Sequence, residues 1–515
     1  MTDANPDIEP NEAAIAEAEP AETEITETTE PAVARVPRRG ILIGARVAVG
    51  SVGVLVAAVA VAAAGLLPLP TLSAQPANVL VSPVPTAQEL VCAGGLLRLG
   101  DETGQDATTA TSIGSPSVTS AASSGDVVTD TLDGPGGQAA PRSIRSAPNE
   151  SAADDAVLLA GSQSQVAANG EFGGLAAAEC AGVSTDSWLA GGATTVGRTT
   201  LLTISNPSEV VATVALSIYG EDGTIDAPGL TGIIVQPHAQ RVIPLSGLAP
   251  ETVSPVVHVT SQGGQVVANL QQSTVRGLEA GGVDLIGATA RPSRELVIPG
   301  VVISNSESVG GRLGESGFAD LITVLRVFVP GNENTSVTVD LVPDDPEALD
   351  VSFTYDLAGG VVEDLPIEEL VDGSYTATIS AGSPIVAAVR VSTVALSAPL
   401  GGAQASDFAW LGAATRVSSD TLVAVADGPS PVLHVNNPTA EPATVTLEAQ
   451  GGGADLSLEV PARSTAVTPV VAGATYRLSG FASIYASVTF VGEGQLAGYG
   501  VQPPALTSSD ITVYP

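Results

Sequence analysis

The sequence contains no lysine. Its 18 basic residues are all arginines, and 55 acidic residues give the 515-residue chain a formal net charge of −37. Binding to nucleic acid depends on clustered lysine and arginine, so this charge balance argues against a nucleic-acid partner. The same shortage of basic residues argues against electrostatic docking on anionic lipid. The acidity is instead typical of a well-solvated surface that keeps a protein soluble.

Motifs for catalysis and for cofactor binding are also missing. We find no G-x-S-x-G elbow, Walker loop, GxGxxG fingerprint or HExxH helix. A zinc site needs three or four converging ligands, and the spacing of the three histidines (His238, His258 and His434) does not suggest one. We therefore predict that the protein is not an enzyme and has no catalytic, cofactor-binding or metal-binding residues.

Acidic loops leave calcium as an alternative, because Ca²⁺ takes oxygen ligands from carboxylates. One candidate loop contains Glu221, Asp222 and Asp226, and another contains Asp344, Asp345, Glu347 and Asp350. The simpler interpretation is an Asp-Gly turn in the first loop and solvated carboxylates in the second. Aromatic residues are scarce, at 2 Trp, 7 Tyr and 7 Phe, which weakens the case for a sugar-binding surface.

One long apolar run indicates where the protein resides. Residues 47–67 (VAVGSVGVLVAAVAVAAAGLL) carry no charge. As a helix with a rise of about 1.5 Å per residue, they can span a hydrocarbon core of about 30 Å. The basic residues that precede the run are Arg35, Arg38, Arg39 and Arg46, and the next one is Arg98. Because basic flanks stay in the cytoplasm, we expect a cytoplasmic N-terminus and an extracellular C-terminal bulk.

A cleaved signal peptide is the alternative for this run. Leu72-Ser73-Ala74 loosely fits the small-residue cleavage pattern. However, more than 40 residues (1–46) precede the run, and the run is longer than the usual apolar region of about 7–15 residues in a signal peptide. We therefore favour an uncleaved, single-pass signal-anchor over residues 41–67 of a cell-membrane protein.

The two cysteines, Cys92 and Cys180, both follow the apolar run. Outside the membrane a cysteine pair more often forms a disulfide than a metal or catalytic site. We therefore predict a structural disulfide. Closing so long a loop stabilises the fold by about 4–5 kcal/mol at most in the chain-entropy model.

Composition divides the chain into segments. Acidic residues with Pro and Thr predict a disordered cytoplasmic tail, and Ser/Thr/Gly-rich sequence predicts a disordered loop. The predicted segments are the acidic tail (1–34), the signal-anchor helix (41–67), a Pro-rich stalk with the first strands (68–100), the low-complexity loop (101–155), a strand segment returning to Cys180 (156–183), and three β-sandwich repeats (184–291, 292–409 and 410–515).

The repeats are visible as strand–turn–strand segments. LLTISNPSEVVATVAL (201–216) matches LHVNNPTAEPATVTL (433–447) at Asn206-Pro207 and Asn437-Pro438, and we expect a hairpin at each. Later in each repeat, apolar residues alternate and should enter one core. They are Val266, Ala268 and Leu270, then Ile385, Ala387 and Val389, then Ile484, Ala486 and Val488. Trp188 and Trp410 look equivalent, each opening a repeat.

Short strands separated by Gly, Pro, Asn and Asp predict an all-β fold. Copies of about 100 residues fit immunoglobulin-like or fibronectin-like sandwiches, whereas a solenoid needs shorter repeats of about 20–50 residues. We predict one N-terminal transmembrane helix followed by a rod of about three tandem immunoglobulin-like/fibronectin-like β-sandwich repeats.

Residues 187–225 (SWLAGGATTVGRTTLLTISNPSEVVATVALSIYGEDGTI) and 254–279 (SPVVHVTSQGGQVVANLQQSTVRGLE) resemble an actinobacterial family of uncharacterised secreted or membrane-anchored proteins, classed as a domain of unknown function. The placement of Cys92 and Cys180 is similar to the pattern of that family. The resemblance implies an actinobacterial envelope protein and brings no activity or catalytic residue.

These features favour a non-enzymatic, membrane-anchored envelope protein that acts as a scaffold or binds a partner, such as an envelope protein or a cell-wall glycan. One alternative is an adhesin or glycan-binding module. Another is a transmembrane signalling subunit acting through its acidic cytoplasmic tail. Fold-level analogy does not separate these functions, because β-sandwiches host many of them.

Overall fold

The computed structural model describes residues 79–81, 88–100, 110–135, 137–146, 157–345, 347–368, 370–399, 402–504 and 511–513. The predicted tail (1–34) and signal-anchor (41–67) lie outside these residues. No helix in the described part of the chain is long and apolar enough to span a membrane. Contacts divide the chain into two units, and the description below concerns the unit Leu80–Val513.

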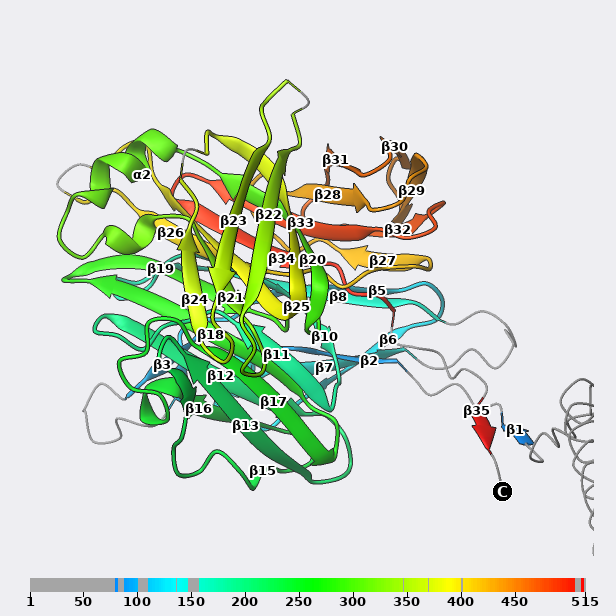
Figure 1. Ribbon diagram of the computed structural model, residues 1–515. Helices are drawn as coiled ribbons and strands as arrows, with labels where there is room; N and C mark the ends of the chain where they lie inside the picture. The colour runs from blue at the N-terminus through cyan, green and yellow to red at the C-terminus, as the bar shows by residue number, and fades with distance from the viewer. Residues whose placement is uncertain are drawn as a thin grey trace, which may run out of the picture. The chain divides into compact units, whose positions relative to one another are not determined.

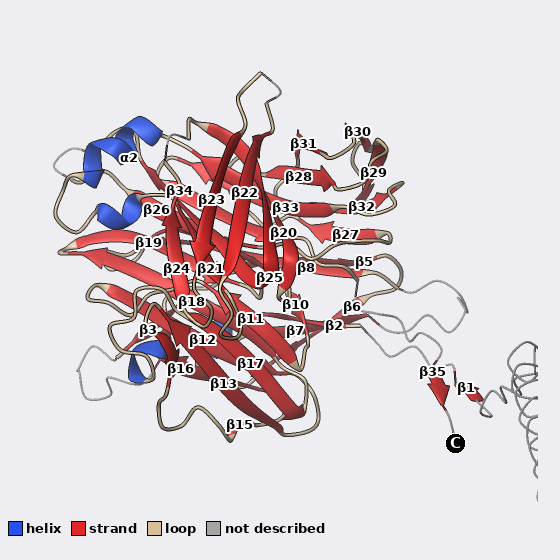
Figure 2. Ribbon diagram, in the orientation of Figure 1, coloured by secondary structure: helices blue, strands red, loops and turns tan. Residues whose placement is uncertain are grey.

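Strands make up most of the described residues (Figures 1 and 2), which confirms the predicted all-β class. The helical segments described are α2 (Ser306–Leu313) and the short 3₁₀ turns η1 (Gly137–Ala139), η2 (Leu245–Gly247) and η3 (Ala319–Leu321). Two short strands, β1 (Val79–Val81) and β35 (Ile511–Val513), pair with each other.

Repeat 1 consists of two antiparallel sheets that enclose one core. The first has the order β16–β12–β18–β19, and the second has the order β11–β17–β13–β14, with β15 also pairing with β13. Their bounds are β11 (Asp186–Ala190), β12 (Arg198–Asn206), β13 (Ala212–Gly220), β14 (Gly223–Ile225), β15 (Ile233–Val235), β16 (Ala239–Pro244), β17 (Val256–Gly263), β18 (Val267–Arg276) and β19 (Glu279–Ile286).

Repeat 2 has the same plan, except that one strand runs through both of its sheets. This strand, β25, pairs with β20 and β22 through its first half and with β21 and β26 through its second half. The bounds are β20 (Ser293–Ile303), β21 (Val324–Phe328), β22 (Thr335–Pro343), β23 (Val351–Leu357), β24 (Val362–Pro366), β25 (Gly373–Val394) and β26 (Ser406–Gly412).

Repeat 3 again has two sheets, ordered β27–β32–β29–β30 and β31–β28–β33–β34. The bounds are β27 (Thr421–Ala424), β28 (Val432–Asn437), β29 (Ala443–Gln450), β30 (Leu456–Val460), β31 (Ser464–Pro469), β32 (Thr475–Ser479), β33 (Tyr485–Gly492) and β34 (Gln495–Gly500). The predicted start of this repeat at residue 410 falls inside β26, which pairs with β25 and therefore belongs to repeat 2.

The predicted core positions are confirmed. The alternating triplets that begin at Val266, Ile385 and Ile484 are all buried, and each triplet lies in the core of its own repeat. A strand places every second side chain on the same face, so period-2 patterning alone fixes these positions.

The predicted hairpins at Asn206-Pro207 and Asn437-Pro438 are wrong. Strands β12 and β13 lie in different sheets of repeat 1, and β28 and β29 lie in different sheets of repeat 3. The turn is therefore an arch across the core. The buried Asn206 side chain donates to the carbonyls of Val210 and Val235, 2.8 and 3.1 Å away, which supplies partners for the backbone where the chain changes sheets.

A fourth module precedes the three repeats, and we call residues 88–182 the N-terminal module. Its sheets are β10–β2–β7–β6, β5–β8–β9 and the pair β3–β4. The bounds are β2 (Glu89–Cys92), β3 (Leu97–Leu99), β4 (Ala110–Ser112), β5 (Ser117–Ala122), β6 (Val127–Thr131), β7 (Arg142–Ser146), β8 (Leu159–Ala168), β9 (Gly173–Glu179) and β10 (Ala181–Gly182).

The N-terminal module corrects the prediction for residues 101–155. That segment contains β4 to β7, although its Ser/Thr/Gly-rich composition predicted no secondary structure. Cys92 and Cys180 form a disulfide, with their Cα atoms 4.2 Å apart, and both side chains are buried with Ile144 and Leu159. The disulfide joins β2 to the end of β9 and so connects the two larger sheets of the module.

Candidate functional site

Strands β9, β19, β26 and β34 come one from each module and pack against one another in a closed ring. The two faces of each strand enter different cores. Leu175 and Ala177 of β9 lie in the core of repeat 3, whereas Ala176 and Ala178 pack against Val283 of β19. Strand β26 likewise divides its side chains between the cores of repeats 1 and 2. We call these four strands the hub.

The closed hub differs from the predicted rod. In a rod each repeat would contact only its neighbours along the chain. Here β9 of the N-terminal module packs against β34 of repeat 3 as well as against β19 of repeat 1. The first and last modules of the described unit are therefore in contact.

Asp407 occupies one end of the hub. Its side chain is fully buried, and its oxygens accept hydrogen bonds from the backbone N–H groups of Leu175, Val283 and Leu496, at 2.7, 3.2 and 3.0 Å. These three donors belong to the other three hub strands. A single carboxyl group therefore connects all four modules.

Glycine makes room for Asp407 on the neighbouring strands. Gly282 has a φ of +118°, and a Cβ atom there would lie 2.9 Å from the Asp407 Oδ1 atom. Gly174 has a φ of +117°, and its Cβ would overlap the same carboxyl group. Both positions favour glycine for its backbone conformation as well as for space.

The other end of the hub opens into a cavity of about 430 Å³, which we call the axial cavity. Pairing registers show which hub residues are equivalent there, because Leu270, Val389 and Val488 pair with Ile286, Leu411 and Tyr499. The next residues are Gly287, Gly412 and Gly500, and all three line the cavity. Leu175, Val283 and Leu496 are equivalent, because each donates its backbone N–H to Asp407. The residue four positions further along the chain is Gly287 after Val283 and Gly500 after Leu496, and on β9 it is Glu179.

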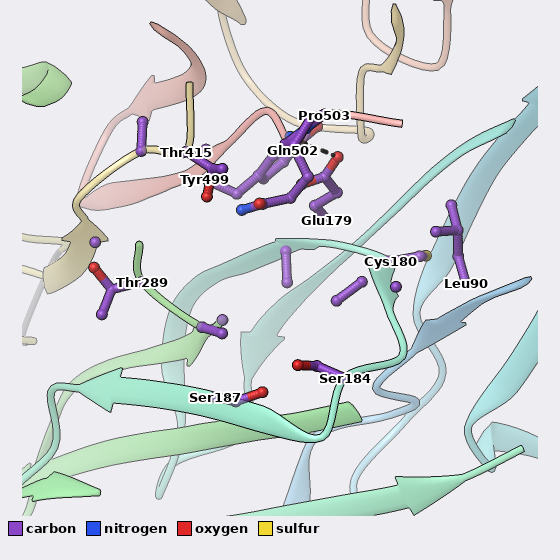
Figure 3. A pocket seen from close by; sticks show the side chains of 18 of the residues that line it. Leu90, Glu179, Cys180, Ser184, Ser187, Thr289, Thr415, Tyr499, Gln502 and Pro503 are labelled. Carbon is purple, nitrogen blue, oxygen red and sulfur yellow. Dashed lines mark hydrogen bonds between the residues drawn. The ribbon is translucent and has the colours of Figure 1, made fainter. Parts of the chain in front are cut away.

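Glu179 lines the axial cavity beside Cys180 (Figure 3). One carboxyl oxygen accepts a hydrogen bond from the backbone N–H of Gln502, 3.3 Å away. The side chain can be reached from the cavity, but protein surrounds it on the other sides. This burial raises the pKa of Glu179 to about 8, although the Gln502 N–H group acts in the opposite direction.

Hydroxyl and amide groups supply the remaining polar part of the wall. Figure 3 shows Ser184, Ser187, Thr289, Thr415 and Gln502 around the cavity. A concave site with a few placed polar groups is typical of small-molecule binding.

The comparisons with known proteins confirm one part of the resemblance seen in the sequence, a family of unknown function. The model of a family of unknown function, DUF5719, matches residues 135–448. This chain belongs to that family. No curated protein and no solved structure matches it. In this member of the family, the matched residues contain three of the four hub strands, β9, β19 and β26.

The two tryptophans are not equivalent, contrary to the prediction from the sequence. Trp188 lies on β11, at the start of repeat 1, whereas Trp410 lies on β26, in the hub. Trp188 stacks on His258 with ring centroids 4.0 Å apart, and the Arg326 guanidinium lies 4.4 Å from the Trp410 ring centroid. Both rings are buried, and both also line the axial cavity.

Arg326 joins repeat 1 to repeat 2. Its guanidinium forms a bidentate pair with Asp364 at 2.7 and 2.8 Å. It also donates to the carbonyls of Gly192, Pro255 and Val253, at 2.9 to 3.1 Å. Burial acts to raise the pKa of Asp364, but the charge and hydrogen bonds of Arg326 outweigh it and hold this pKa below its usual range.

His434 takes part in an arrangement that resembles part of a catalytic triad. Its ring nitrogens lie 3.0 Å from the Asp344 Oδ2 atom and 2.8 Å from the Thr489 Oγ1 atom. His434 and Thr489 are both buried, and Gly300 packs over them so closely that a Cβ there would lie 2.9 Å from the Thr489 Cγ2 atom. A substrate has no access to this threonine, so the three residues form an interface between repeats 2 and 3.

The remaining sequence candidates lie apart from the hub. His258 lies 3.4 Å from Asp186, and His238 lies 3.1 Å from Glu209. Glu221 accepts the backbone N–H groups of Val253 and Ser254, so its oxygens cap a turn. Among the described residues, no group of three or more His, Cys, Asp or Glu side chains is placed to hold a metal ion.

Sequence reasoning did not identify Asp407 or Glu179 as site residues. Asp407 stands in the segment SDFAWLG and Glu179 directly before Cys180, and neither belongs to a known motif. The available signal was the set of glycines at matching positions of the repeats, which becomes informative only when the pairing registers are known.

Proposed function

We propose that this protein is a non-enzymatic component of an actinobacterial cell envelope, anchored in the cell membrane by residues 41–67, with immunoglobulin-like modules outside the membrane that bind or scaffold a partner. The observation that carries the proposal is the buried disulfide between Cys92 and Cys180. Disulfides persist in oxidising compartments, and this one follows an uncharged run of membrane-spanning length.

The architecture supports a binding role over a catalytic one. The triad-like residues around His434 are closed to substrate, and the Ser184 hydroxyl at the axial cavity bonds the backbone of Asp186 rather than a side-chain base. Trp188 and Trp410 are only 8% and 2% exposed, which leaves little aromatic surface for stacking on a sugar, so a protein partner is favoured over a glycan.

The topology is tested by labelling in intact cells with a membrane-impermeant maleimide. The two native cysteines are joined in the disulfide, so an introduced cysteine supplies the only free thiol. Val196→Cys suits the outer portion, because Val196 is 87% exposed, and Ala14→Cys suits the acidic tail. We expect labelling of the Val196→Cys variant in intact cells and of the Ala14→Cys variant only after lysis. The opposite pattern would contradict the proposal.

Partner binding is tested by crosslinking in native cells. Amine-reactive reagents find no lysine on this chain, so a carboxylate-reactive crosslinker is used. A cell-envelope protein that is captured from whole cells, but lost after protease treatment of the cell surface, would support the proposal, and capture of a cell-wall glycan alone would favour the glycan-binding alternative. Capture of a cytoplasmic protein alone, abolished by deletion of residues 1–34, would favour the signalling alternative.

A further inference from the structure

The two ends of the hub each present one carboxyl group among small neighbours, but their surroundings differ. At one end, Asp407 lies against Gly174 and Gly282, and its oxygens accept three backbone N–H groups from other strands. At the other end, Glu179 occupies the position that is Gly287, Gly412 and Gly500 on the other strands. Its one hydrogen bond in the structure comes from the backbone N–H of Gln502, at 3.3 Å.

The axial cavity therefore holds a carboxyl group with unused capacity to accept hydrogen bonds. Each carboxylate oxygen can accept more than one donor, and a buried polar group without partners is costly. Gly287 and Gly500 leave open space at the cavity wall, whereas a Cβ at Gly412 would lie 3.1 Å from the Thr289 Cβ atom. At Gly287 an added Cβ would meet no atom within 4 Å. At about 430 Å³, this space falls within the range of small-molecule sites.

Charge selects the class of ligand. Two carboxyl groups, Glu179 and Asp186, line the cavity, and the one basic residue there, Arg291, is exposed. An anion would therefore find little compensation for its buried charge. A metal ion is disfavoured because the described residues contain no group of three ligating side chains. An organic cation needs only one carboxylate and a few neutral acceptors, which the hydroxyl groups of Ser184, Ser187 and Thr289 can provide.

The form of the cation follows from the aromatic residues. Quaternary ammonium groups are usually bound by exposed aromatic faces. Trp188, Trp410 and Tyr499 line the cavity, but they are only 8%, 2% and 8% exposed, and one face of each tryptophan is covered, by His258 and by Arg326. A primary ammonium group, with three N–H donors, matches a wall of carboxylate, hydroxyl and carbonyl acceptors better.

We propose that the axial cavity binds a small molecule through a primary ammonium group that pairs with the Glu179 carboxylate. This site goes beyond the proposed envelope function and does not depend on where the protein resides.

The test uses the full-length protein purified in detergent and two probes of equal size, n-butylammonium and 1-butanol. Binding is measured by ligand-detected NMR titration at about pH 9, where Glu179, whose pKa is about 8, is ionised and an alkylammonium group is still protonated. For a probe with so few atoms we expect a Kd of about 1 mM for n-butylammonium. We expect binding of 1-butanol to be about tenfold weaker or more, because the alcohol lacks the charge.

Two variants and a control locate the site. Glu179→Gln keeps the shape of the side chain and should weaken n-butylammonium about tenfold or more, while leaving 1-butanol unchanged. Gly287→Leu fills the open space and should abolish binding of both probes. Glu295→Gln changes an exposed carboxylate on β20, outside the cavity, and should have no effect.

Thermal unfolding identifies folded variants, so that a loss of binding is assigned to the site only where the unfolding temperature is retained. If folded Glu179→Gln protein binds n-butylammonium as tightly as the unmodified chain, the proposal is wrong. It is also wrong if the unmodified folded chain binds no n-butylammonium at about 10 mM, or if n-butylammonium binds folded Gly287→Leu protein with unchanged affinity.

Discussion

Buried acidic side chains are the distinctive residues of this fold. Asp284, on β19, is fully buried and accepts hydrogen bonds from the backbone N–H groups of Trp410 and Leu285, at 2.7 and 2.9 Å. Burial raises the pKa of Asp284 to about 8, against the effect of these two donors. The unfolded chain exposes the same carboxyl group to water, where its pKa is about 3.9.

This difference makes stability depend on pH. Between pH 5 and pH 7.5 the Asp284 carboxyl group is already ionised in the unfolded chain and still protonated in the folded chain, so the free energy of unfolding falls as pH rises. The decrease from this group is at most about 1.4 kcal/mol per pH unit. In the Asp284→Asn variant this contribution is absent. Denaturant unfolding at pH 5 and pH 7.5 should therefore show a smaller decrease in the free energy of unfolding for the variant than for the unmodified chain. An equal or larger decrease would show that the pKa of Asp284 is not raised in the fold.

The sequence predicts some of these residues and not others. Cys92 and Cys180 are the two cysteines of a chain expected outside the membrane, so their pairing follows from composition and location. Asp407, Asp284 and Glu179 act through contacts between strands from different modules. Such contacts depend on the closure of the hub, which local patterning does not encode.

At the scale of elements, the Asn-Pro arch recurs in repeats 1 and 3. Asn437 donates to the carbonyl of Glu441 at 2.8 Å and accepts the Thr439 N–H at 3.0 Å, which matches the bonds of Asn206 to Val210 and Ser208. The sequence correctly identified the repeated turn. It did not show that the turn changes sheets, because the same residues favour hairpins and arches.

We predict that Asn206→Ala lowers the free energy of unfolding by about 1–3 kcal/mol, because the carbonyls of Val210 and Val235 lose their donor within the fold. Asn206→Asp retains the acceptor for Ser208 but not the donor, so it should be destabilised as well. Thermal unfolding measures both variants. A result in which the Asp variant is as stable as the unmodified chain would show that the donated bonds contribute nothing.

At the scale of the whole described unit, the N-terminal module completes the hub. Its disulfide fixes the end of β9, from which Glu179 reaches the cavity. The double variant Cys92→Ser/Cys180→Ser should lose up to about 4–5 kcal/mol of stability in the chain-entropy model. Reductant should lower the denaturation midpoint of the unmodified chain and leave that of the double variant unchanged. Equal midpoints for the oxidised and reduced chain would contradict this role.

Closure of the hub is also the reason that residues 101–155 contain strands, although their composition predicted a disordered loop. Strands β5 and β6 contain many Ser, Thr and Asp residues and bury little surface by themselves. They are ordered because β8 and β7 pair with them and the module is held against repeats 1 and 3. The apolar triplets of the repeats needed no such context, since period-2 alternation already marks a buried face.

One carboxyl group, that of Asp407, holds strands from four modules together. Hydrogen exchange of the Leu175, Val283 and Leu496 amides, measured with residue resolution in the unmodified chain and in Asp407→Ala, tests this most directly. We expect slow exchange of all three amides in the unmodified chain, and a loss of protection at all three together in the variant. If the variant remains folded and these amides of the other modules stay as protected as before, Asp407 does not hold the hub together.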